Sequence, residues 1–508
     1  MSGFRSVMDQ LRAVFLEEGF SADQVIEAIG QSGQADLSRN HTFGAHVALE
    51  GRDDGLATLI RLFVLQASVP SSLAASLLPL QALQRLELVD TDGRTVRARV
   101  DIRPFDDQTD GTDGWVVSDH AASVDGHLDR SLPDHVLGVS PASVSLAQIT
   151  DRRLVGSALD LGTGSGIQAI HLARHAGQVV ATDLSRRALD LASLTFALND
   201  LKVELCQGSL YEPVDQRSFD LICSNPPYVI APPTKQRLVY REGAFEGDGL
   251  MQAVITGAAQ RLNSGGSLHV VGNWAHCSGQ DWAQRLSSWM PAGCQGFFVE
   301  RERLDVFEYI EIWLADAGLI GQPDYQEQYQ RWLDYFAALR IEAVGLGWLT
   351  MVKTGRPTRS RSQSWPFPVA QPVADDLMAH IQAMNWSDWS DEQMLAAHWT
   401  LADNVSQELI APIGVADPQA VILRRHDGLA RAIEADAALA GVLGACDGEL
   451  SLESILVAVA QLLDLPAAEL TTQVLDQVRK LVADTWLTPG VTKIDGRTGV
   501  EAELADTV

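Results

Sequence analysis

The chain has 508 residues, of which 46% are hydrophobic, and its 66 Asp and Glu against 38 Lys and Arg give a formal net charge of −28. That length predicts two to four domains with buried cores, and the sequence has no run of about 18 apolar residues that would predict a transmembrane helix. The five cysteines are scattered without CxxC spacing, so we expect no metal site, no disulfide framework and a reducing, cytoplasmic environment.

The acidic charge is concentrated in the two flanks of the chain. Residues 1–150 hold 11 Lys and Arg against 21 Asp and Glu, residues 151–365 hold 20 against 23, and residues 366–508 hold 7 against 22. Acidic surfaces repel phosphate backbones at long range. The distribution therefore disfavours broad DNA binding and leaves open a local contact with structured RNA.

The N-terminal segment, residues 1–130, predicts helices followed by a β-hairpin. Apolar residues recur at helical spacing over 4–19, and two apolar runs at 86–89 and 95–102 flank an Asp-Thr-Asp-Gly turn. This order predicts a winged-helix-like module. Four arginines on or beside the hairpin favour nucleic-acid binding: Arg94, Arg97, Arg99 and Arg103. The acidity of the module favours protein recognition instead.

Strands and helices then alternate over residues 131–357, which predicts a parallel sheet. A glycine-rich turn, Asp160-Leu-Gly-Thr-Gly-Ser-Gly166, follows the first strand, and Asp183 ends the next one, 21 residues after Gly162. Glycines let a ligand approach the main chain, and an acid at this spacing reaches a ribose hydroxyl. Ligands of such sheets bind beyond the carboxyl ends of the strands. The pattern predicts a nucleoside-containing cofactor, with an ordinary tight turn as the alternative.

A third strand end carries the stretch Asn225-Pro226-Pro227-Tyr228, directly after an apolar strand at 219–223. Prolines fix φ and remove N–H donors, so the loop is stiff. The Asn225 side-chain oxygen and the Pro226 carbonyl can then accept hydrogen bonds from one NH2 group. An amide or nucleobase NH2 is a poor nucleophile because its lone pair is delocalised, and two acceptors favour a pyramidal nitrogen. Tyr228 offers a face for the planar group. We expect the loss of Asn225 to raise the reaction barrier by about 3 kcal/mol; a plain Pro-Pro turn is the alternative.

Residues 155–275, with both motifs, resemble a class I S-adenosylmethionine-dependent methyltransferase of the amino-methylating Asn-Pro-Pro-Tyr group. That group includes release-factor glutamine methyltransferases, adenine N6 methyltransferases of DNA and RNA, and ribosomal guanine methyltransferases. The resemblance implies an α/β fold with a Rossmann-like sheet of seven strands and S-adenosyl-L-methionine as cofactor. Asp160-Leu-Gly-Thr-Gly and Ser224-Asn-Pro-Pro-Tyr-Val are most similar to the glutamine methyltransferase branch.

The resemblance also implies roles for individual residues. Those expected to bind the cofactor lie at the strand ends: Asp160, Gly162, Thr163, Gly164, Gly166, Asp183, Leu184, Ser209, Leu210 and Asn225. Ser209 stands where many members of the group carry Asp. The implied catalytic residues are Asn225, Pro226 and Tyr228, and the implied substrate-binding residues are Pro227, Tyr228 and Arg241. The segment before the first strand, residues 136–143, resembles the part that covers the methionine end of the cofactor.

Further along, Asp248 is expected to cap a helix over 250–262, and a helical insertion is expected at about 302–341. A basic stretch with Lys353, Arg356, Arg359 and Arg361 leads into a linker at 358–370. Residues 371–490 predict a second winged-helix-like module, with a strand at 420–424 and helices near 436–446, 451–463 and 467–484. Residues 491–508 predict a disordered tail.

These patterns predict methyl transfer to a planar NH2 nitrogen of a macromolecule. The first hypothesis is a glutamine amide of a translation factor or ribosomal protein, so a protein substrate is favoured over RNA or DNA. The second is an adenine N6 or another base of rRNA or DNA. The third is a partner-binding scaffold that retains the cofactor site without catalysis, because fold-level kinship does not choose the substrate.

Overall fold

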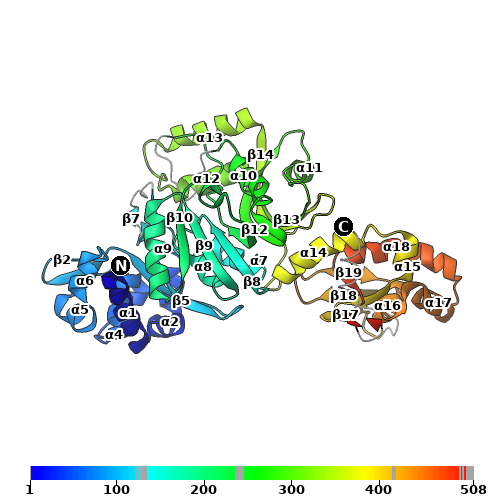
Figure 1. Cartoon of the computed structure of the whole chain (residues 1–508), viewed down its shortest axis with the longest axis horizontal. Helices are drawn as coiled ribbons and strands as arrows, with labels where there is room; N and C mark the ends of the chain where they lie inside the picture. The colour runs from blue at the N-terminus through cyan, green and yellow to red at the C-terminus, as the bar shows by residue number, and fades with distance from the viewer. Residues whose placement is uncertain are drawn as a thin grey trace. The chain divides into compact units, whose positions relative to one another are not determined.

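The computed structural model describes residues 2–121, 123–125, 127, 128, 134–234, 245–414, 419–490, 493, 494, 497 and 498. The chain divides into two compact units, residues 1–366 and 367–508 (Figure 1). Among the described residues, no helix combines the length and the apolar character that crossing a membrane requires.

The first unit is organised around a sheet of eight strands in the order β10-β9-β8-β11-β12-β14-β13-β15. The strands are β8 (Val155–Leu161), β9 (Ala176–Asp183), β10 (Val203–Gln207), β11 (Phe219–Ser224), β12 (Leu262–Cys277), β13 (Cys294–Asp305), β14 (Ile341–Lys353) and β15 (Arg359–Ser364). All neighbours pair in parallel except β14, which is antiparallel to β12 and β13. The chain runs outward from β8 to β10 and then returns to β11, so the order reverses between β8 and β11. Ligands bind at such a switch point, and the predicted Rossmann-like α/β fold is confirmed.

Helices cover this sheet because its central strands are apolar on both faces. The helices of the domain are α7 (Pro141–Ile149), α8 (Ile167–Leu172), α9 (Arg186–Leu198), α10 (Gly249–Ala258) and α11 (Trp282–Ser287), with a 3-10 turn at Glu212–Val214. Leu159, Val180 and Ile222 are fully buried and share one core with Val254 and Ile255 of α10. The burial of each such side chain stabilises the fold by about 1.5–3 kcal/mol. The core therefore fixes the positions of the strands and of their carboxyl ends.

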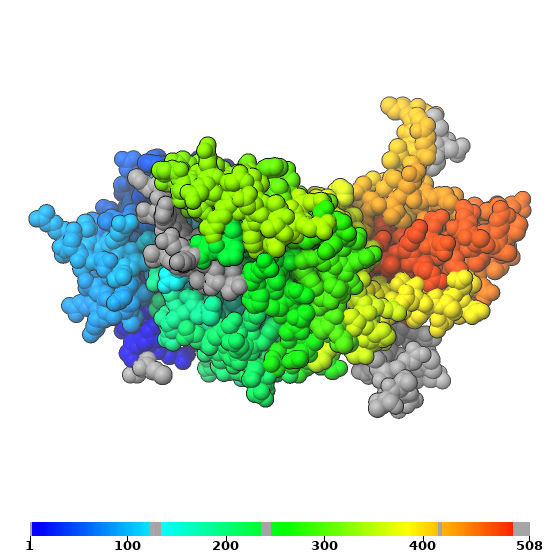
Figure 2. Space-filling model, turned by 90° about the horizontal axis from the view of Figure 1, so that it is seen from above, coloured from blue at the N-terminus to red at the C-terminus, as the bar shows by residue number. Residues whose placement is uncertain are grey.

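The sheet differs from the predicted one at its edge. Residues 359–364, expected in a linker, form β15, which pairs in parallel with β13 from Gln295↔Arg359 to Glu300↔Ser364. Edge pairing is made by the backbone, so the polar sequence Arg-Ser-Arg-Ser-Gln-Ser gave no apolar signal for it. Between β13 and β14 lies the insertion, α12 (Val306–Asp316) and α13 (Tyr325–Leu339). Its atoms, yellow-green in Figure 2, form a broad outer surface of the first unit.

The N-terminal part of the first unit is helical with a small sheet of order β1-β3-β2. Its elements are α1 (Ser2–Glu17), α2 (Ala22–Leu37), α3 (Phe43–Ala48), α4 (Gly55–Leu59), a π-helical turn (Ile60–Val64), β1 (Val69–Pro70), α5 (Ser71–Leu77), α6 (Leu80–Arg85), β2 (Val89–Thr91) and β3 (Thr95–Ala98). The predicted hairpin is present as β2 and β3. The connectivity is compatible with a winged-helix-like module, which stays a prediction.

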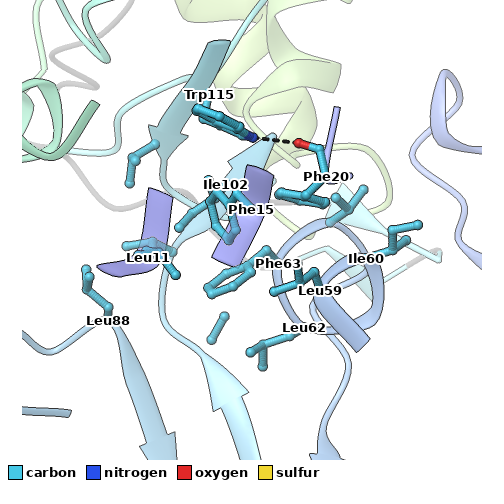
Figure 3. Close-up of a cluster of buried hydrophobic side chains, with 14 of the residues drawn as sticks. Leu11, Phe15, Phe20, Leu59, Ile60, Leu62, Phe63, Leu88, Ile102 and Trp115 are labelled. Carbon is cyan, nitrogen blue, oxygen red and sulfur yellow. Dashed lines mark hydrogen bonds between the residues drawn. The ribbon is translucent and has the colours of Figure 1, made fainter. Parts of the chain in front are cut away.

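A second hairpin lies between this part and the helices α8 and α9 of the sheet domain. It consists of β4 (Asp101–Asp107) and β5 (Thr112–Ser118), and a two-residue pair, β6 (Ser123–Val124) and β7 (His127–Leu128), follows it. The buried ring of Trp115 packs beside Phe15, and its Nε1 donates to the Phe20 carbonyl at 2.7 Å (Figure 3). Because Leu191 and Leu198 of α9 belong to the same cluster, the N-terminal part and the sheet domain share a core.

The second unit, from residue 367, contains two three-stranded sheets, β20-β16-β21 and β17-β18-β19. Its elements are α14 (Ala374–Trp386), α15 (Asp391–Ala396), β16 (His398–Leu401), β17 (Val405–Ile410), β18 (Ala420–Arg425), β19 (Ala432–Ala435), α16 (Ala437–Gly444), β20 (Asp447–Ser451), α17 (Leu452–Leu462), α18 (Ala467–Ala483) and β21 (Leu487–Pro489). The predicted strand and helices correspond to β18 and α16 to α18. Of residues 491–508 the structure describes only β22 (Lys493–Ile494) and β23 (Arg497–Thr498).

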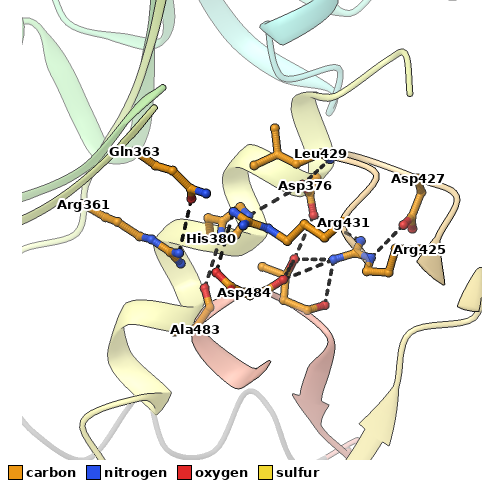
Figure 4. A network of polar contacts seen from close by, with 11 residues as sticks. Arg361, Gln363, Asp376, His380, Arg425, Asp427, Leu429, Arg431, Ala483 and Asp484 are labelled. Atoms are coloured by element: carbon orange, nitrogen blue, oxygen red, sulfur yellow. Dashed lines mark hydrogen bonds and ion pairs between the residues drawn. The ribbon is translucent and has the colours of Figure 1, made fainter. Parts of the chain in front are cut away.

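A buried polar network joins distant parts of the second unit (Figure 4). Arg425 lies 3.1 Å from the carboxylate of Asp376, and the Thr485 hydroxyl donates to the same carboxylate at 2.9 Å. Asp376 also accepts from the Leu429 backbone N–H at 3.0 Å. Buried charges need such partners, so we interpret the network as a structural one.

Candidate active site

The carboxyl ends of β8, β9 and β11 meet at a cavity of about 220 Å³. Its walls come from the turn after β8, the end of β9 and the loop after β11, together with the segment before α7. The predicted residues that line it are Gly162, Thr163, Gly164, Asp183, Leu184, Ser209, Leu210, Asn225, Pro226 and Pro227. The structure therefore brings most of the predicted site residues together, as their positions at strand ends implied.

The turn after β8 is a rigid cradle. Gly162, Gly164 and Gly166 have φ values of +79°, +55° and +90°, a region that favours glycine. The N–H groups of Gly162 and Thr163 both donate to the Thr182 carbonyl, at 2.9 and 2.8 Å. The turn is thus attached to β9, and the absence of Cβ atoms at Gly162 and Gly164 lets a ligand approach the main chain.

Asp160 lies behind this turn and does not line the cavity. Its side chain is buried, and its Oδ2 accepts hydrogen bonds from the Thr163 hydroxyl at 2.6 Å and from Ala169 N at 3.1 Å. Burial, helped by the charge of Asp183, raises the pKa of Asp160 to about 7, although the hydrogen bonds from Thr163 and Ala169 oppose the rise. An ionised Asp160 is therefore unfavourable unless a positive charge comes near it.

Asp183 closes the other side of the cradle. Its Oδ2 accepts from Gly164 N at 2.9 Å and its Oδ1 accepts from Ser185 N at 2.8 Å. Burial raises the pKa of Asp183, and these backbone hydrogen bonds oppose that rise. Each carboxylate oxygen has a further lone pair, so the side chain can also accept from two ribose hydroxyls. Leu184 and Leu210 supply apolar walls beside it.

The loop after β11 carries a side-chain hydrogen-bond acceptor that has no donor among the described residues. Ser224 ties its start to β8, because the Ser224 hydroxyl donates to the Leu161 carbonyl at 2.8 Å. The Oδ1 atom of Asn225 is buried and accepts no hydrogen bond from any described residue. A buried acceptor without a donor is unfavourable by about 1–3 kcal/mol. The Asn225 oxygen can therefore accept from a donor that the described residues do not supply.

Tyr228, one of the predicted substrate residues, is not among the residues that line the cavity. Tyr228 is half-buried and packs in a cluster with Val229, Ile230 and side chains of α12 and α13. Burial raises the pKa of its phenol, and the charge of Asp316 adds to the rise. Arg241 lies outside the described residues. Stacking by Tyr228 and substrate binding by Arg241 stay predictions.

The segment before α7 also forms part of the cavity wall, and the sequence predicts its role only in part. His135, Val136 and Ser140 line the cavity. Asp119 holds this segment, because its carboxylate accepts from Val136 N at 2.9 Å and from Arg187 Nε at 2.9 Å. Asp119, Val136 and Arg187 are far apart in the sequence, so no local sequence pattern predicts their contact.

Phe245 and Leu250 also line the cavity, and the segment between them corrects one prediction. Asp248 stands at the start of α10 but makes no side-chain capping bond. Its carboxylate accepts instead from Ala275 N at 2.8 Å and from Arg285 at 2.7 Å. It therefore ties the start of α10 to the end of β12.

Comparisons with known proteins agree with this geometry. Residues 138–284 match the family model of the Methyltransferase small domain, and residues 17–99 match a Domain of unknown function (DUF7059). The Ribosomal RNA small subunit methyltransferase C of Escherichia coli O7:K1 is 31% identical over 155 residues, which is 30% of this chain and 41% of that protein. The chain thus spans about two fifths of the length of these curated relatives.

Two solved structures are similar over part of the chain. A methyltransferase from Pyrococcus furiosus has a TM-score of 0.27 with 18% identity, covering 46% of this chain and 92% of the other. The T. thermophilus 16S rRNA N2 G1207 methyltransferase, in complex with AdoMet and guanosine, has a TM-score of 0.26 with 19% identity, covering 44% and 58%. The fold assignment rests on the strand order described above.

The site fits the cofactor of this family. The glycine cradle, the carboxylate of Asp183 and the apolar walls of Leu184 and Leu210 are chemically suited to the amino-acid, ribose and adenine parts of S-adenosylmethionine in turn, and these roles stay predictions. Together with the family match over residues 138–284, these features show that the chain carries a class I S-adenosylmethionine-dependent methyltransferase domain.

Proposed function

We propose that the protein methylates an exocyclic NH2 group of a base in ribosomal RNA. One structural observation carries the proposal: Asn225 lines the cofactor cavity, and its buried Oδ1 has no donor among the described residues. A flat NH2 group is the donor that this oxygen and the adjacent Pro226 carbonyl suit. The relatives named ribosomal RNA small subunit methyltransferase C, similar over 155 residues, support RNA as its source.

The residues of the chain would orient the acceptor. Asn225 Oδ1 and the Pro226 carbonyl accept the two N–H hydrogens, which localises the nitrogen lone pair for attack. When bound, S-adenosylmethionine supplies an electrophilic methyl group. A nitrogen–carbon bond forms as the carbon–sulfur bond breaks, and the nitrogen, now acidic, releases its extra proton to water. No strong base is needed at the nitrogen.

A glutamine amide of a translation-related protein is the second candidate. It presents the same planar NH2 group, so the Asn-Pro-Pro-Tyr loop suits it equally. The charge of the chain favours it, because the net −28 opposes the approach of RNA outside a local contact. The printed names of the relatives point to rRNA, and for that reason RNA ranks first here.

Transfer of labelled methyl groups tests the assignment. The protein is incubated with methyl-labelled S-adenosylmethionine in three separate reactions. The first contains transcribed small-subunit rRNA, the second small ribosomal subunits and the third ribosomal proteins. Nuclease-sensitive label, located as an N-methylated base by mass spectrometry of nucleosides, is the expected result. Label that only protease removes would instead support glutamine methylation, and cofactor binding without any label would support a scaffold.

A further inference from the structure

The insertion α12–α13 contacts the chain directly C-terminal to the Asn-Pro-Pro-Tyr loop. Tyr309 of α12 is fully buried, and its hydroxyl oxygen accepts from Ile230 N at 2.9 Å and from Asn273 Nδ2 at 2.7 Å. Ile230 follows Asn225 by five residues. One phenol oxygen therefore joins the catalytic loop to β12 of the sheet.

The stiffness of the loop couples the position of Ile230 to that of Asn225. Pro226 and Pro227 fix two of the φ angles between Asn225 and the attachment point, which reduces the number of soft dihedrals between the two ends. At its start, Ser224 belongs to β11 and donates to Leu161 of β8. With Ile230 N held by Tyr309, both ends of the six-residue segment from Asn225 to Ile230 are attached to the sheet domain.

Asn273 indicates that this contact serves something other than stability. Its side chain is fully buried, and its Oδ1 accepts no hydrogen bond from the described residues. A buried amide with an unused acceptor is unfavourable for folding, and an apolar side chain would avoid that cost. Its NH2 group, by contrast, fixes the place of the Tyr309 hydroxyl.

A second tyrosine of the insertion binds the chain downstream. The Tyr335 hydroxyl of α13 accepts from Gly247 N at 2.9 Å, next to Phe245 of the cavity wall. Both helices lie beyond residue 284, where the match to the Methyltransferase small domain ends. The contacts of α12 with Ile230 and of α13 with Gly247 are therefore made by helices outside the matched residues.

We propose that Tyr309 is a positioning residue for methyl transfer: its hydroxyl holds the Ile230 backbone and so fixes the place of Asn225 Oδ1 and the Pro226 carbonyl. The inference rests on the proposed function, in that those two acceptors hold the NH2 group. It requires no particular acceptor molecule, since a base and a glutamine amide need the same two oxygens.

The test replaces Tyr309 by Phe, which removes the hydroxyl and retains the ring packing against Trp332 and Phe336. A displacement of about 1 Å at the reacting centre can cost about a hundredfold in rate. We expect kcat to fall between about tenfold and a hundredfold, while the Kd for S-adenosylmethionine changes less than about twofold. In amide hydrogen exchange, the N–H of Ile230 should lose protection. The rate is referred to the fraction of molecules that bind cofactor, so partial unfolding does not count as a loss of kcat.

Tyr329→Phe is the matched control. Its hydroxyl donates to Glu311 at 3.2 Å on the exposed face of the insertion, so kcat and Ile230 exchange should stay at wild-type values. If Tyr309→Phe does not fold, Asn273→Leu, of similar shape, removes the donor that orients the hydroxyl and should lower kcat in the same direction. A kcat within about twofold of wild type in the tested variant would overturn the proposal.

The acceptor in these assays is whichever one the wild-type protein labels. Label in protein rather than RNA would contradict the proposed rRNA substrate and leave the Tyr309 test intact. A normal kcat in Tyr309→Phe with labelled rRNA would contradict the positioning role and leave the proposed substrate intact. The two failures are thus distinguishable.

Discussion

Asp183 and Gly164 connect the two strands that form the cofactor cradle: the Asp183 Oδ2 atom accepts a hydrogen bond from Gly164 N at 2.9 Å. The same carboxylate accepts from Ser185 N through its other oxygen at 2.8 Å. The acid expected to bind ribose is therefore oriented before any ligand arrives. Preorganisation of this kind lowers the entropic cost of binding.

Asp183→Asn should weaken cofactor binding. An amide has one oxygen and one NH2 group, so its NH2 would face the Gly164 or the Ser185 N–H, and one ribose hydroxyl would lose its charged acceptor. The loss of a charge-assisted bond is worth about 1.5–3 kcal/mol, or at least about tenfold in Kd. Calorimetric titration with S-adenosylmethionine measures it. Asp190→Asn, at an exposed acid paired with Arg186, should bind cofactor normally, and an unchanged Kd in Asp183→Asn would refute the role.

The pKa of Asp160, raised to about 7 by burial, predicts a pH-dependent stability. Between the unfolded pKa of 3.8 and the folded one, the native protein binds more protons than the unfolded chain, so the free energy of unfolding falls as pH rises. Asp160→Asn can retain both hydrogen bonds, because Thr163 and Ala169 donate to the same oxygen. Denaturant titrations of the cofactor-free protein from about pH 5 to about pH 8 should show a steeper loss in wild type than in the variant. Equal slopes would argue against a protonated Asp160.

The pKa of Asp160 also predicts that the affinities for the cofactor and for its product depend differently on pH. A bound sulfonium cation favours the ionised form of Asp160, so binding of S-adenosylmethionine should release a proton and strengthen as pH rises through about 7. S-adenosylhomocysteine lacks that charge, and its affinity should change less. Titrations of both ligands at about pH 6 and about pH 8 compare the two, and identical pH dependence would contradict the prediction.

Gly166 should not tolerate alanine. At φ +90° a Cβ atom would lie 2.6 Å from the Phe196 ring, whereas at Gly265, with φ +74°, nothing lies within 4 Å. Gly265→Ala should therefore cost only the backbone strain, about 1 kcal/mol, and Gly166→Ala should add overpacking of about 1–3 kcal/mol. Denaturant unfolding measures both, and equal losses would show that Phe196 moves aside freely.

The positions of the strand-end residues that line the cavity could be predicted closely from the sequence. The strand ends at Leu161, Asp183 and Ser224 coincide with the ends of apolar runs, because strands buried on both faces need continuous apolar sequence. Gly162, Gly164 and Gly166 have positive φ values that favour glycine, and the two prolines fix φ in the Asn-Pro-Pro-Tyr loop. Local pattern and tertiary position agree in this region.

The remaining features depend on long-range contacts that carry no local signal. β15 is held by backbone pairing at the sheet edge, whereas its polar sequence predicts a linker. Asp248 has the position of a helix cap, but Arg285 and Ala275 N compete for its carboxylate and bind it instead. The junction at Tyr309 joins residues 36 and 79 positions apart. A single sequence does not reveal such partners.

The most direct measurement is a comparison of transfer rate and cofactor affinity in Asn225→Ala. The account predicts that kcat falls by about a hundredfold to a thousandfold, while the Kd for S-adenosylmethionine stays within about threefold of wild type. Asn263→Ala, which removes a hydrogen bond to Asp220 outside the cavity walls, should keep both values. Transfer at the wild-type rate in Asn225→Ala, or a collapse of cofactor affinity that accounts for its whole loss, would contradict the role assigned to the Asn225 oxygen.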